Sequence, residues 1–289
     1  MRKLFYLLFI SVALLSCNSA HVKTTQSNLD QILAKFHDAS SAKVMIAAHR
    51  AENDKYPENT IAAIDYSAET GVDVVELDVR TTKDGKIVLF HDGSSLERMV
   101  GKEGTIRDYT YDELLKFNLK KKKSDDPAEY KIPLALEAFK HAHGKLMVDI
   151  DIKDVSIKQL VDIVHAAKLE KQALFFDSDF AVLDSVLLLD STLMVMPRAR
   201  SLEDVKKIIA RYHPPIIHID PSFYTDEVVK TIKDAGARIW INALGKADIQ
   251  AKIGLVDSAY TPLIEKGANV LQTDLPLIMN DFLVEKNLR

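Results

Sequence analysis

Short runs of β-branched and other apolar residues alternate along the chain with stretches whose apolar residues recur at helical spacing. Between most of these runs the spacing predicts amphipathic helices, as at Ile61, Ile64 and Ala68, and start signals such as Thr225-Asp226-Glu227 precede several of them. The runs predict eight strands, at residues 44–49, 73–80, 146–152, 173–176, 193–196, 216–220, 238–242 and 269–273. Eight strand–helix units in a chain of 289 residues favour a (β/α)8 TIM barrel over a doubly wound sheet.

One further apolar run, at residues 86–90, follows the turn signal Thr82-Lys83-Asp84-Gly85. We expect this run to fold back as a hairpin on the second strand, which would bring His91 beside Glu76 and Asp78. Residues 93–142 then separate the second and third main strands, with short helices announced by a capping box at Thr110 to Glu113. We expect this insertion to form a small cap over the barrel mouth.

The composition excludes several classes of protein. The 38 basic and 42 acidic residues give a net charge of -4, which argues against a nucleic-acid partner because such proteins rely on a basic surface. The balance of 47% hydrophobic and 28% charged residues is that of a globular chain rather than a disordered one. A single cysteine excludes an internal disulfide and a zinc site built from cysteines. No protein partner is evident from the sequence.

The amino terminus has the pattern of a targeting segment. Arg2 and Lys3 precede an apolar run from Leu4 to Leu15, which is short for a membrane span, and Cys17 follows at once. Leu14-Leu15-Ser16-Cys17 resembles a bacterial lipoprotein signal, in which residues 1–16 are cleaved and Cys17 is lipidated; an uncleaved anchor and a buried cytosolic cysteine are the alternatives. Residues 17–42 would form a tether with a short helix, and residues 43–289 the barrel domain. The protein would then lie in the cell envelope, anchored to a membrane outside the cytoplasm, on the periplasmic side.

Polar side chains follow the predicted strands where those strands end, and the carboxyl ends of barrel strands carry the active site. Glu76 and Asp78 share one face of the second strand because successive side chains alternate, and Asp149, Asp151 and Lys153 share one face of the third main strand. Several inward carboxylates repel one another unless a cation neutralises them. Ligands that are all oxygen favour Mg²⁺ or Ca²⁺.

An ordered series of motifs resembles the signature of the glycerophosphodiester phosphodiesterase family. The series runs from about residue 43 to 285 and comprises His49-Arg50, Pro57-Glu58-Asn59-Thr60, Glu76-Leu77-Asp78-Val79, Thr82-Lys83-Asp84-Gly85, His91-Asp92, Trp240 to Asn242 and Thr273-Asp274-Leu275-Pro276. The resemblance implies a barrel of the phospholipase C-like phosphodiesterase type. It also implies an enzyme, a phosphoric diester hydrolase that releases glycerol 3-phosphate and an alcohol from glycerophosphodiesters.

The resemblance also implies a role for each matching residue. Glu76, Asp78 and Asp151 would hold one divalent metal, Mg²⁺ or Ca²⁺. His49 and His91 would be the acid–base pair, and Arg50 and Lys153 would bind the phosphate. Two further residues are candidates for substrate binding, each with a structural alternative: Asn59 could instead cap a helix or orient His49, and Trp240 could instead fill the core.

Two positions depart from the family pattern. Ala51 stands where the family usually has glycine, and Asp151 stands where it usually has glutamate. Asp151 is shorter by one methylene, so the metal would lie nearer the third main strand or a water would complete its shell. Two other functions stay open from the sequence: a phosphoinositide or lysophospholipid phosphodiesterase on the same scaffold, and a lipoprotein that binds head groups without turnover.

Overall fold

A computed structural model describes residues 28–122 and 126–289. The predicted signal segment 1–16, Cys17 and the tether up to residue 27 lie outside the described residues. Within the described residues, no helix combines the length and the apolar character needed to cross a membrane.

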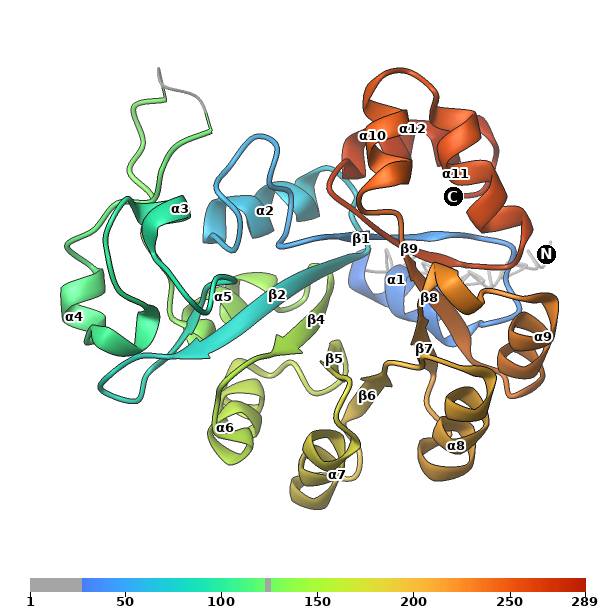
Figure 1. Ribbon diagram of the computed structural model, residues 1–289, viewed down its shortest axis with the longest axis horizontal. Coiled ribbons are helices and arrows are strands. Elements are labelled where there is room, and N and C mark those ends of the chain that lie inside the picture. Colours follow the sequence, from blue (N-terminus) through green and yellow to red (C-terminus); the bar gives the residue numbers. More distant parts are fainter. Residues whose placement is uncertain (1–27, 123–125) are drawn as a thin grey trace, which may run out of the picture.

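Eight parallel strands form a barrel, and helices surround it (Figure 1). Neighbouring strands pair in the order β6-β5-β4-β2-β1-β9-β8-β7, and a parallel bridge between Arg198 and His218 joins the two ends of this series. The predicted strands all form, with ends that differ by at most one residue. They are β1 (Met45–Ala48), β2 (Val74–Thr81), β4 (Met147–Ile152), β5 (Ala173–Asp177), β6 (Met194–Pro197), β7 (Ile216–Ile219), β8 (Arg238–Asn242) and β9 (Val270–Thr273).

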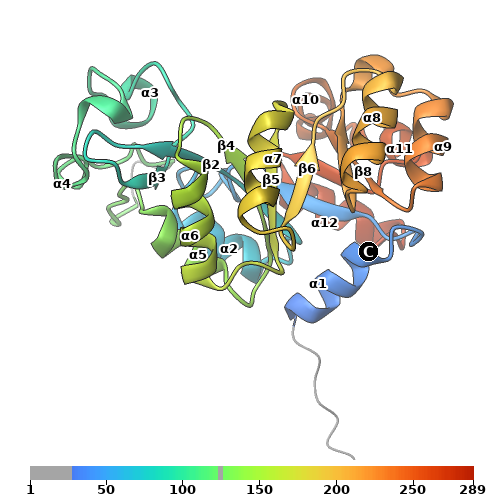
Figure 2. The same ribbon diagram turned by 90° about the horizontal axis from the view of Figure 1, so that it is seen from below.

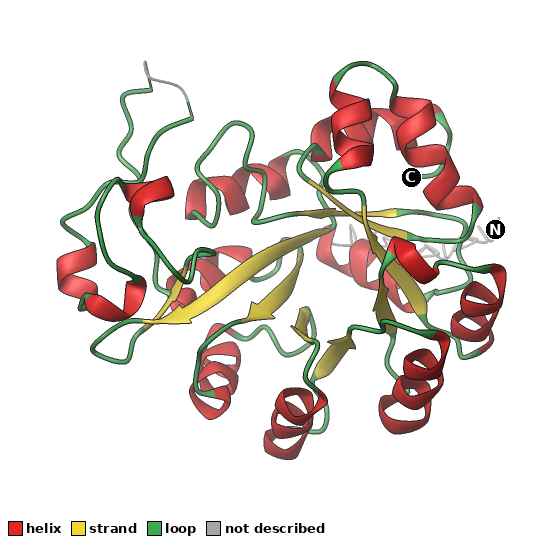
Figure 3. Ribbon diagram, viewed as in Figure 1, coloured by secondary structure: helices red, strands yellow, loops and turns green. Residues whose placement is uncertain are grey.

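The helices pack their apolar faces on the outside of this barrel, in the alternation of strand and helix that Figure 3 shows by colour. Serine, threonine or aspartate side chains cap the first turns of α2, α6, α7, α8 and α9, which explains why these helices begin directly after their loops. The surrounding helices are α2 (Ile61–Glu69), α5 (Ala135–Ala142), α6 (Ile157–Ala167), α7 (Phe180–Leu189), α8 (Leu202–Tyr212), α9 (Asp226–Asp234), α10 (Lys246–Lys252), α11 (Val256–Glu265) and α12 (Pro276–Glu285), with a 3-10 turn, η2, at Pro221–Phe223.

The predicted hairpin is present. Strand β3 (Ile87–Leu89) pairs antiparallel with the end of β2, with Val79 opposite Leu89 and Thr81 opposite Ile87. The backbone N–H of Phe90 donates to the carbonyl of Asp78 at 3.0 Å. The hairpin therefore returns the chain to the carboxyl end of β2, where His91 follows.

The insertion after β3 is smaller than predicted and lies beside the barrel. It contains α3 (Glu97–Val100), a 3-10 turn, η1 (Ile106–Asp108), and α4 (Tyr111–Leu114), and its buried residues form a core of their own. Figures 1 and 2 both place it at one side of the barrel rather than across its end. Helix α5, which the predicted range 93–142 includes, instead packs in the main core through Ala135, Ala138 and Phe139, so it is a barrel helix.

The helix predicted within the tether is also part of the folded domain. Helix α1 (Asn28–His37) buries Ile32 and Phe36 in the main core. The buried guanidinium of Arg238, at the start of β8, donates to the carbonyls of Lys35, Phe36 and Asp38 at the end of this helix. Asp73, just before β2, accepts from Lys35 Nζ at 2.6 Å and from Arg289 Nη1 at 2.9 Å. Helix α1 is therefore fixed to the amino-terminal end of the barrel.

Candidate active site

A small cavity lies at the carboxyl ends of the barrel strands, with a volume of about 100 Å³. The strands β1, β2, β4, β5, β6, β7, β8 and β9 or the loops after them all contribute to its wall. Its lining residues are His49, Glu76, Asp78, His91, Asp149, Asp151, Phe176, Arg198, His218, Asn242, Leu244 and Gln272. The cavity is thus at the end of the fold where barrel enzymes carry their chemistry.

Three carboxylates converge at one side of this cavity. Glu76, Asp78 and Asp151 each place an oxygen within 4.8 Å of the oxygens of the other two. The pairing of β2 with β4 explains this, because Asp78 lies opposite Asp151 and both point inward. The shorter side chain of Asp151 therefore still reaches the group.

The electrostatics of the group favour a cation. Burial raises the pKa of Glu76 well above its usual range, and repulsion from Asp78, Asp151 and Asp149 adds to this effect. Burial also raises the pKa of Asp149 and of Asp151, with a further contribution from the neighbouring carboxylates. The buried Oδ1 atom of Asp149 has no hydrogen-bond partner among the described residues, and the buried Oδ1 atom of Asp78 makes no hydrogen bond there, although Lys153 Nζ lies 3.2 Å from it. This all-oxygen group fits a hard divalent cation, which would supply both positive charge and a partner for unpaired oxygens.

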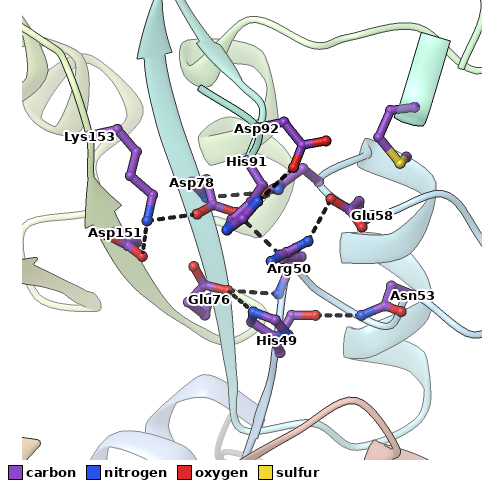
Figure 4. Close-up of polar contacts among 12 residues, drawn as sticks. His49, Arg50, Asn53, Glu58, Glu76, Asp78, His91, Asp92, Asp151 and Lys153 are labelled. Atoms are coloured by element: carbon purple, nitrogen blue, oxygen red, sulfur yellow. Dashed lines mark hydrogen bonds and ion pairs between the residues drawn. The ribbon is translucent and has the colours of Figure 1, made fainter. Parts of the chain in front are cut away.

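Lys153 lies between two members of the carboxylate group (Figure 4). Its Nζ atom is 2.5 Å from Asp151 Oδ2 and 3.2 Å from Asp78 Oδ1. Burial alone would lower the pKa of Lys153, but the charges of Asp151 and Asp78 outweigh this and raise it. Lys153 is therefore a permanent cation at the edge of the carboxylate group.

Arg50 lies on the other side of Asp78 and contacts Glu58 and Glu76. Its backbone N–H donates to Glu76 Oε2 at 2.8 Å, and its Nη1 donates to Glu58 Oε1 at 3.0 Å. Arg50 Nε, which is buried, is 3.7 Å from Asp78 Oδ2 and makes no hydrogen bond within the described residues. The side chain therefore retains unused donor capacity beside the carboxylates.

The turn that presents Arg50 is held in an unusual backbone conformation. Arg50 and Ala51 have φ angles of 57° and 62°, in the left-handed region. This region costs a residue with a Cβ atom roughly 1–2 kcal/mol, which accounts for the glycine that the family usually has at the position of Ala51. The Ala51 N–H donates to the carbonyl of Glu76 at 3.1 Å, so the strained turn is tied directly to β2.

Each of the two predicted acid–base residues has a carboxylate on its Nδ1 atom. His49 Nδ1 is 2.8 Å from Asp274 Oδ1, and His91 Nδ1 is 2.9 Å from Asp92 Oδ1. His49 Nε2 is 4.0 Å from Glu76 Oε2. The Nε2 atom of each ring is thus the nitrogen left for proton transfer.

An arginine of the insertion supports one of these histidines. Arg98, in α3, donates through Nε and Nη2 to both oxygens of Asp92, at 2.7 and 3.0 Å. The same guanidinium donates to both oxygens of Glu58, at 2.8 and 2.6 Å. Burial would raise the pKa of Glu58, but the hydrogen bonds and charges of Arg98 and Arg50 lower it, so Glu58 stays ionised between them.

None of the four predicted substrate-binding residues is among the lining residues of the cavity: Arg50 and Lys153 contact the carboxylates at its edge, whereas Asn59 and Trp240 are buried behind its wall. Trp240 has no exposed surface, and its Nε1 donates to Asn242 Oδ1 at 3.2 Å and to Gln272 Oε1 at 3.4 Å. Strand alternation explains this, because Trp240 points inward one layer below Asn242, where it fills the barrel core. Asn59 is 2% exposed; its Nδ2 donates to Asp78 Oδ2 at 2.9 Å and its Oδ1 accepts from the Asp78 N–H, so it orients Asp78 and not His49.

Sequence reasoning missed three residues that support the site. Asp92 and Asp274 stand inside recognised motifs, but the motifs alone assign neither of them a role. For Asp92, the available signal was its position directly after a histidine at a strand end. For Asp274, it was the position at the end of a strand. Nothing in the sequence singled out Arg98.

Comparison with known proteins agrees with this geometry. Residues 49–213 match the Glycerophosphoryl diester phosphodiesterase family, a match that covers more than half of the chain. The chain belongs to this family. It is therefore a phosphodiesterase, and the predicted barrel of this family is confirmed.

Individual relatives show the same likeness. A glycerophosphodiester phosphodiesterase of Caldanaerobacter subterraneus is 38% identical over 112 residues, which are 38% of this chain and 46% of that protein. The crystal structure of a glycerophosphoryl diester phosphodiesterase from Parabacteroides distasonis superposes with a TM-score of 0.78 at 25% identity, over 90% of this chain and 93% of that one. An Oleispira antarctica phosphodiesterase, solved in complex with the product sn-glycerol-3-phosphate, shares the fold with a TM-score of 0.68 at 22% identity, over 84% of this chain and 99% of that one.

Proposed function

We propose that this protein hydrolyses glycerophosphodiesters to glycerol 3-phosphate and a free alcohol such as choline, ethanolamine, glycerol or inositol, with a divalent metal and two histidines. One observation carries the proposal: two carboxylate-held histidines and three converging carboxylates line one cavity, and two cationic side chains, Arg50 and Lys153, contact those carboxylates. The sn-glycerol-3-phosphate bound to the Oleispira antarctica enzyme supports the same substrate class.

Glu76, Asp78 and Asp151 would hold the metal, Mg²⁺ or Ca²⁺. A bound divalent cation neutralises charge on the phosphate and so lowers the barrier to nucleophilic attack. Arg50 and Lys153 flank Asp78 on opposite sides, so they would bind phosphate oxygens next to the same carboxylate group. Their permanent charges offset the negative charge that develops on phosphorus–oxygen bonds during the reaction.

The histidines would move the two protons of the reaction. One Nε2 atom takes a proton from the attacking hydroxyl, and the other gives a proton to the departing alcohol. Attack by water yields glycerol 3-phosphate directly. Attack by the glycerol hydroxyl of the substrate yields a cyclic phosphate, which water then opens to glycerol 3-phosphate with the two histidines in exchanged roles. Asp274 and Asp92 fix the orientation of the two rings, since each accepts at Nδ1. This arrangement keeps Nε2 of each ring available throughout.

The cavity argues for a small polar substrate over the alternative of a lysophospholipid or phosphoinositide. Phe176 and Leu244 are the two aliphatic or phenyl side chains among its described lining residues, and the other lining side chains are charged or polar. A head-group binder without turnover has no use for two proton carriers, and both histidines are present here.

The experiment is a turnover assay with the full chain in detergent. Glycerophosphoethanolamine, glycerophosphocholine and glycerophosphoinositol are incubated with and without chelator, and glycerol 3-phosphate is followed by a coupled reaction. We expect product that disappears with chelator and returns with Mg²⁺ or Ca²⁺. No product from any of these diesters with either metal would refute the proposal.

We further propose that Cys17 carries a lipid and anchors the protein to a membrane outside the cytoplasm, on the periplasmic side of the envelope. The support is the sequence pattern of residues 1–17, with two basic residues, an apolar run and a single cysteine. Expression of the full chain and of Cys17→Ala with radiolabelled fatty acid tests this. Label and membrane association in the wild type but not in the variant are expected; equal labelling of both would refute the anchor.

A further inference from the structure

One side of the active-site cavity contains a buried histidine that the proposed reaction does not use. His218, in β7, lines the cavity and is 3% exposed. Both of its ring nitrogens are buried, and neither has a hydrogen-bond partner among the described residues. Buried polar groups almost always have partners, so an imidazole with two unpaired nitrogens at a cavity wall indicates a missing ligand.

Two amides line the same side of the cavity. Asn242 in β8 and Gln272 in β9 lie directly opposite each other in the sheet. Each accepts a hydrogen bond from Trp240 Nε1 through its side-chain oxygen. Since an indole N–H is only a donor, it fixes both oxygens toward itself and leaves both NH₂ groups free to donate elsewhere. Neither NH₂ group donates to any residue that the structure describes.

This side of the cavity is separate from the carboxylate group. The carboxylates come from β2 and β4, whereas His218, Asn242 and Gln272 come from β7, β8 and β9, which form the other half of the strand order. The rings of Phe176 and Trp240 lie 5.1 and 6.3 Å from the His218 ring, and they hold the imidazole in place without using its nitrogens.

The state of the imidazole defines what it can bind. Burial, together with the nearby charge of Arg198, lowers the pKa of His218 to about 3, so the ring is neutral at ordinary pH. A neutral imidazole has one donor and one acceptor nitrogen. A hydroxyl group also donates and accepts, whereas a phosphate diester oxygen only accepts and a quaternary ammonium group does neither.

We propose that His218, together with the NH₂ groups of Asn242 and Gln272, forms a subsite that binds the hydroxyl groups of the alcohol esterified to the phosphate. This proposal rests on the proposed function, because the phosphate must lie at the carboxylate group for its alcohol to reach the subsite. The glycerol of the substrate and a polyol leaving group share this chemistry. The subsite makes His218 a determinant of specificity for polyol esters over simple alkyl esters.

The test measures binding directly, so that it does not depend on turnover. Glycerol 3-phosphate and n-propyl phosphate, which lacks both hydroxyls, are titrated by calorimetry into the full chain in detergent with Mg²⁺. We expect the wild type to bind glycerol 3-phosphate at least tenfold more tightly, which corresponds to about 1.4 kcal/mol. In His218→Phe, a substitution of similar shape beside two aromatic rings, this preference should fall to about twofold or less.

Two controls keep the outcome interpretable. Thermal unfolding of His218→Phe should be unchanged or higher, because the phenyl ring removes two unpaired buried nitrogens. Should that variant unfold, Gln272→Met provides a second removal of a subsite group at similar volume. A preserved preference for glycerol 3-phosphate, or equal weakening of both ligands, would exclude the glycerol as the bound group, and an unchanged KM for glycerophosphoinositol in the same variant would then overturn the proposal.

Kinetics with two diesters distinguish the source of the hydroxyls. If the subsite binds the glycerol, His218→Phe raises KM for glycerophosphocholine and glycerophosphoinositol alike. If it binds the leaving alcohol, KM rises for glycerophosphoinositol alone, because choline has no free hydroxyl when esterified. Wild-type protein without turnover would refute the proposed function, whereas a wild type with turnover and a variant with unaltered preference would refute the subsite only.

Discussion

Asp274 Oδ1 lies 2.8 Å from His49 Nδ1, although 225 positions separate the two residues along the chain. Burial would raise the pKa of Asp274, but the hydrogen bond with His49 and its charge outweigh this and lower it, so the carboxylate is ionised. An ionised acceptor at Nδ1 fixes both the tautomer and the direction of the ring. The loop after β9 thus controls a histidine at the end of β1.

Asp274→Asn is therefore expected to reduce kcat by about tenfold to a hundredfold, a fraction of the 10²–10⁴ that a positioned acid or base contributes. KM should change little, because Asp274 does not line the cavity. Steady-state kinetics and the pH–rate profile measure this, with the exposed Asp257→Asn as control. A fall in kcat/KM caused entirely by KM would contradict a positioning role.

Replacing either acid–base histidine should abolish most turnover. His49→Ala and His91→Ala are each expected to lower kcat by about 10²-fold to 10⁴-fold while metal binding, measured by calorimetry, stays largely intact. The exposed His165, which pairs with Asp190 at 3.0 Å, provides a control as His165→Ala. Unchanged turnover in both site variants would remove the basis of the proposed mechanism.

The insertion is expected to affect catalysis through a single arginine. Arg98→Met should lower kcat about tenfold, because Asp92 loses its two hydrogen bonds and holds His91 less firmly. Arg98→Lys should recover little, since an ammonium cannot bind two carboxylates in forked geometry. Arg107→Met removes another arginine of the insertion, paired with Asp154, and serves as the control; an equal loss in that variant would argue for general weakening of the insertion.

Acid should destabilise the wild type more than His218→Phe. The pKa of His218 is about 3 in the folded protein and about 6.5 ordinarily, with Arg198, Arg200 and Asp220 as the charges around it. Between these pH values the unfolded chain therefore binds a proton that the folded chain does not. The contribution of neutral His218 to the free energy of unfolding is fully present above about pH 6.5 and decreases as the pH falls toward 3. Between about pH 7.5 and 5 the wild type should lose about 2 kcal/mol more than the variant in urea unfolding. Parallel pH dependence of the two proteins would contradict this.

The fixed position of helix α1 yields a stability prediction. Arg238→Met should cost about 2–4 kcal/mol, because three carbonyls at the end of α1 lose a buried donor. Arg211→Met, which breaks an exposed pair with Asp184, should cost less than about 1 kcal/mol. Urea unfolding measures both, and similar small losses would show that Arg238 does not hold the helix.

Most of the barrel could be predicted because its signals are local. Each strand is a short apolar run bounded by turns, and the inward face of β2 follows from alternation alone, which places Glu76 with Asp78. The depth of a side chain in the barrel is not local: Trp240 and Asn242 share a face, but the end of β8 determines that only Asn242 reaches the cavity. The packing of α5 is not local either. The sequence pattern alone places this helix in the insertion, because its contacts with the main core are made by residues far away along the chain.

The remaining parts of the site depend on long-range contacts. Arg98 reaches Glu58 across 40 positions, and the left-handed conformation of Asn59, with φ of 56°, turns its amide toward Asp78. No periodicity encodes such contacts. The carboxylates and histidines could be predicted because they end strands, whereas the residues that hold them come from loops and from the short helix α3.

Helix α1 lies at the end of the barrel opposite the cavity, and this has a consequence for how an anchored enzyme would meet its substrate. If Cys17 carries a lipid, as proposed, the tether joins the described domain at Asn28, on the side of the barrel away from the cavity. The opening of the site would then be free to face the aqueous compartment, from which soluble, already deacylated head-group esters would reach it.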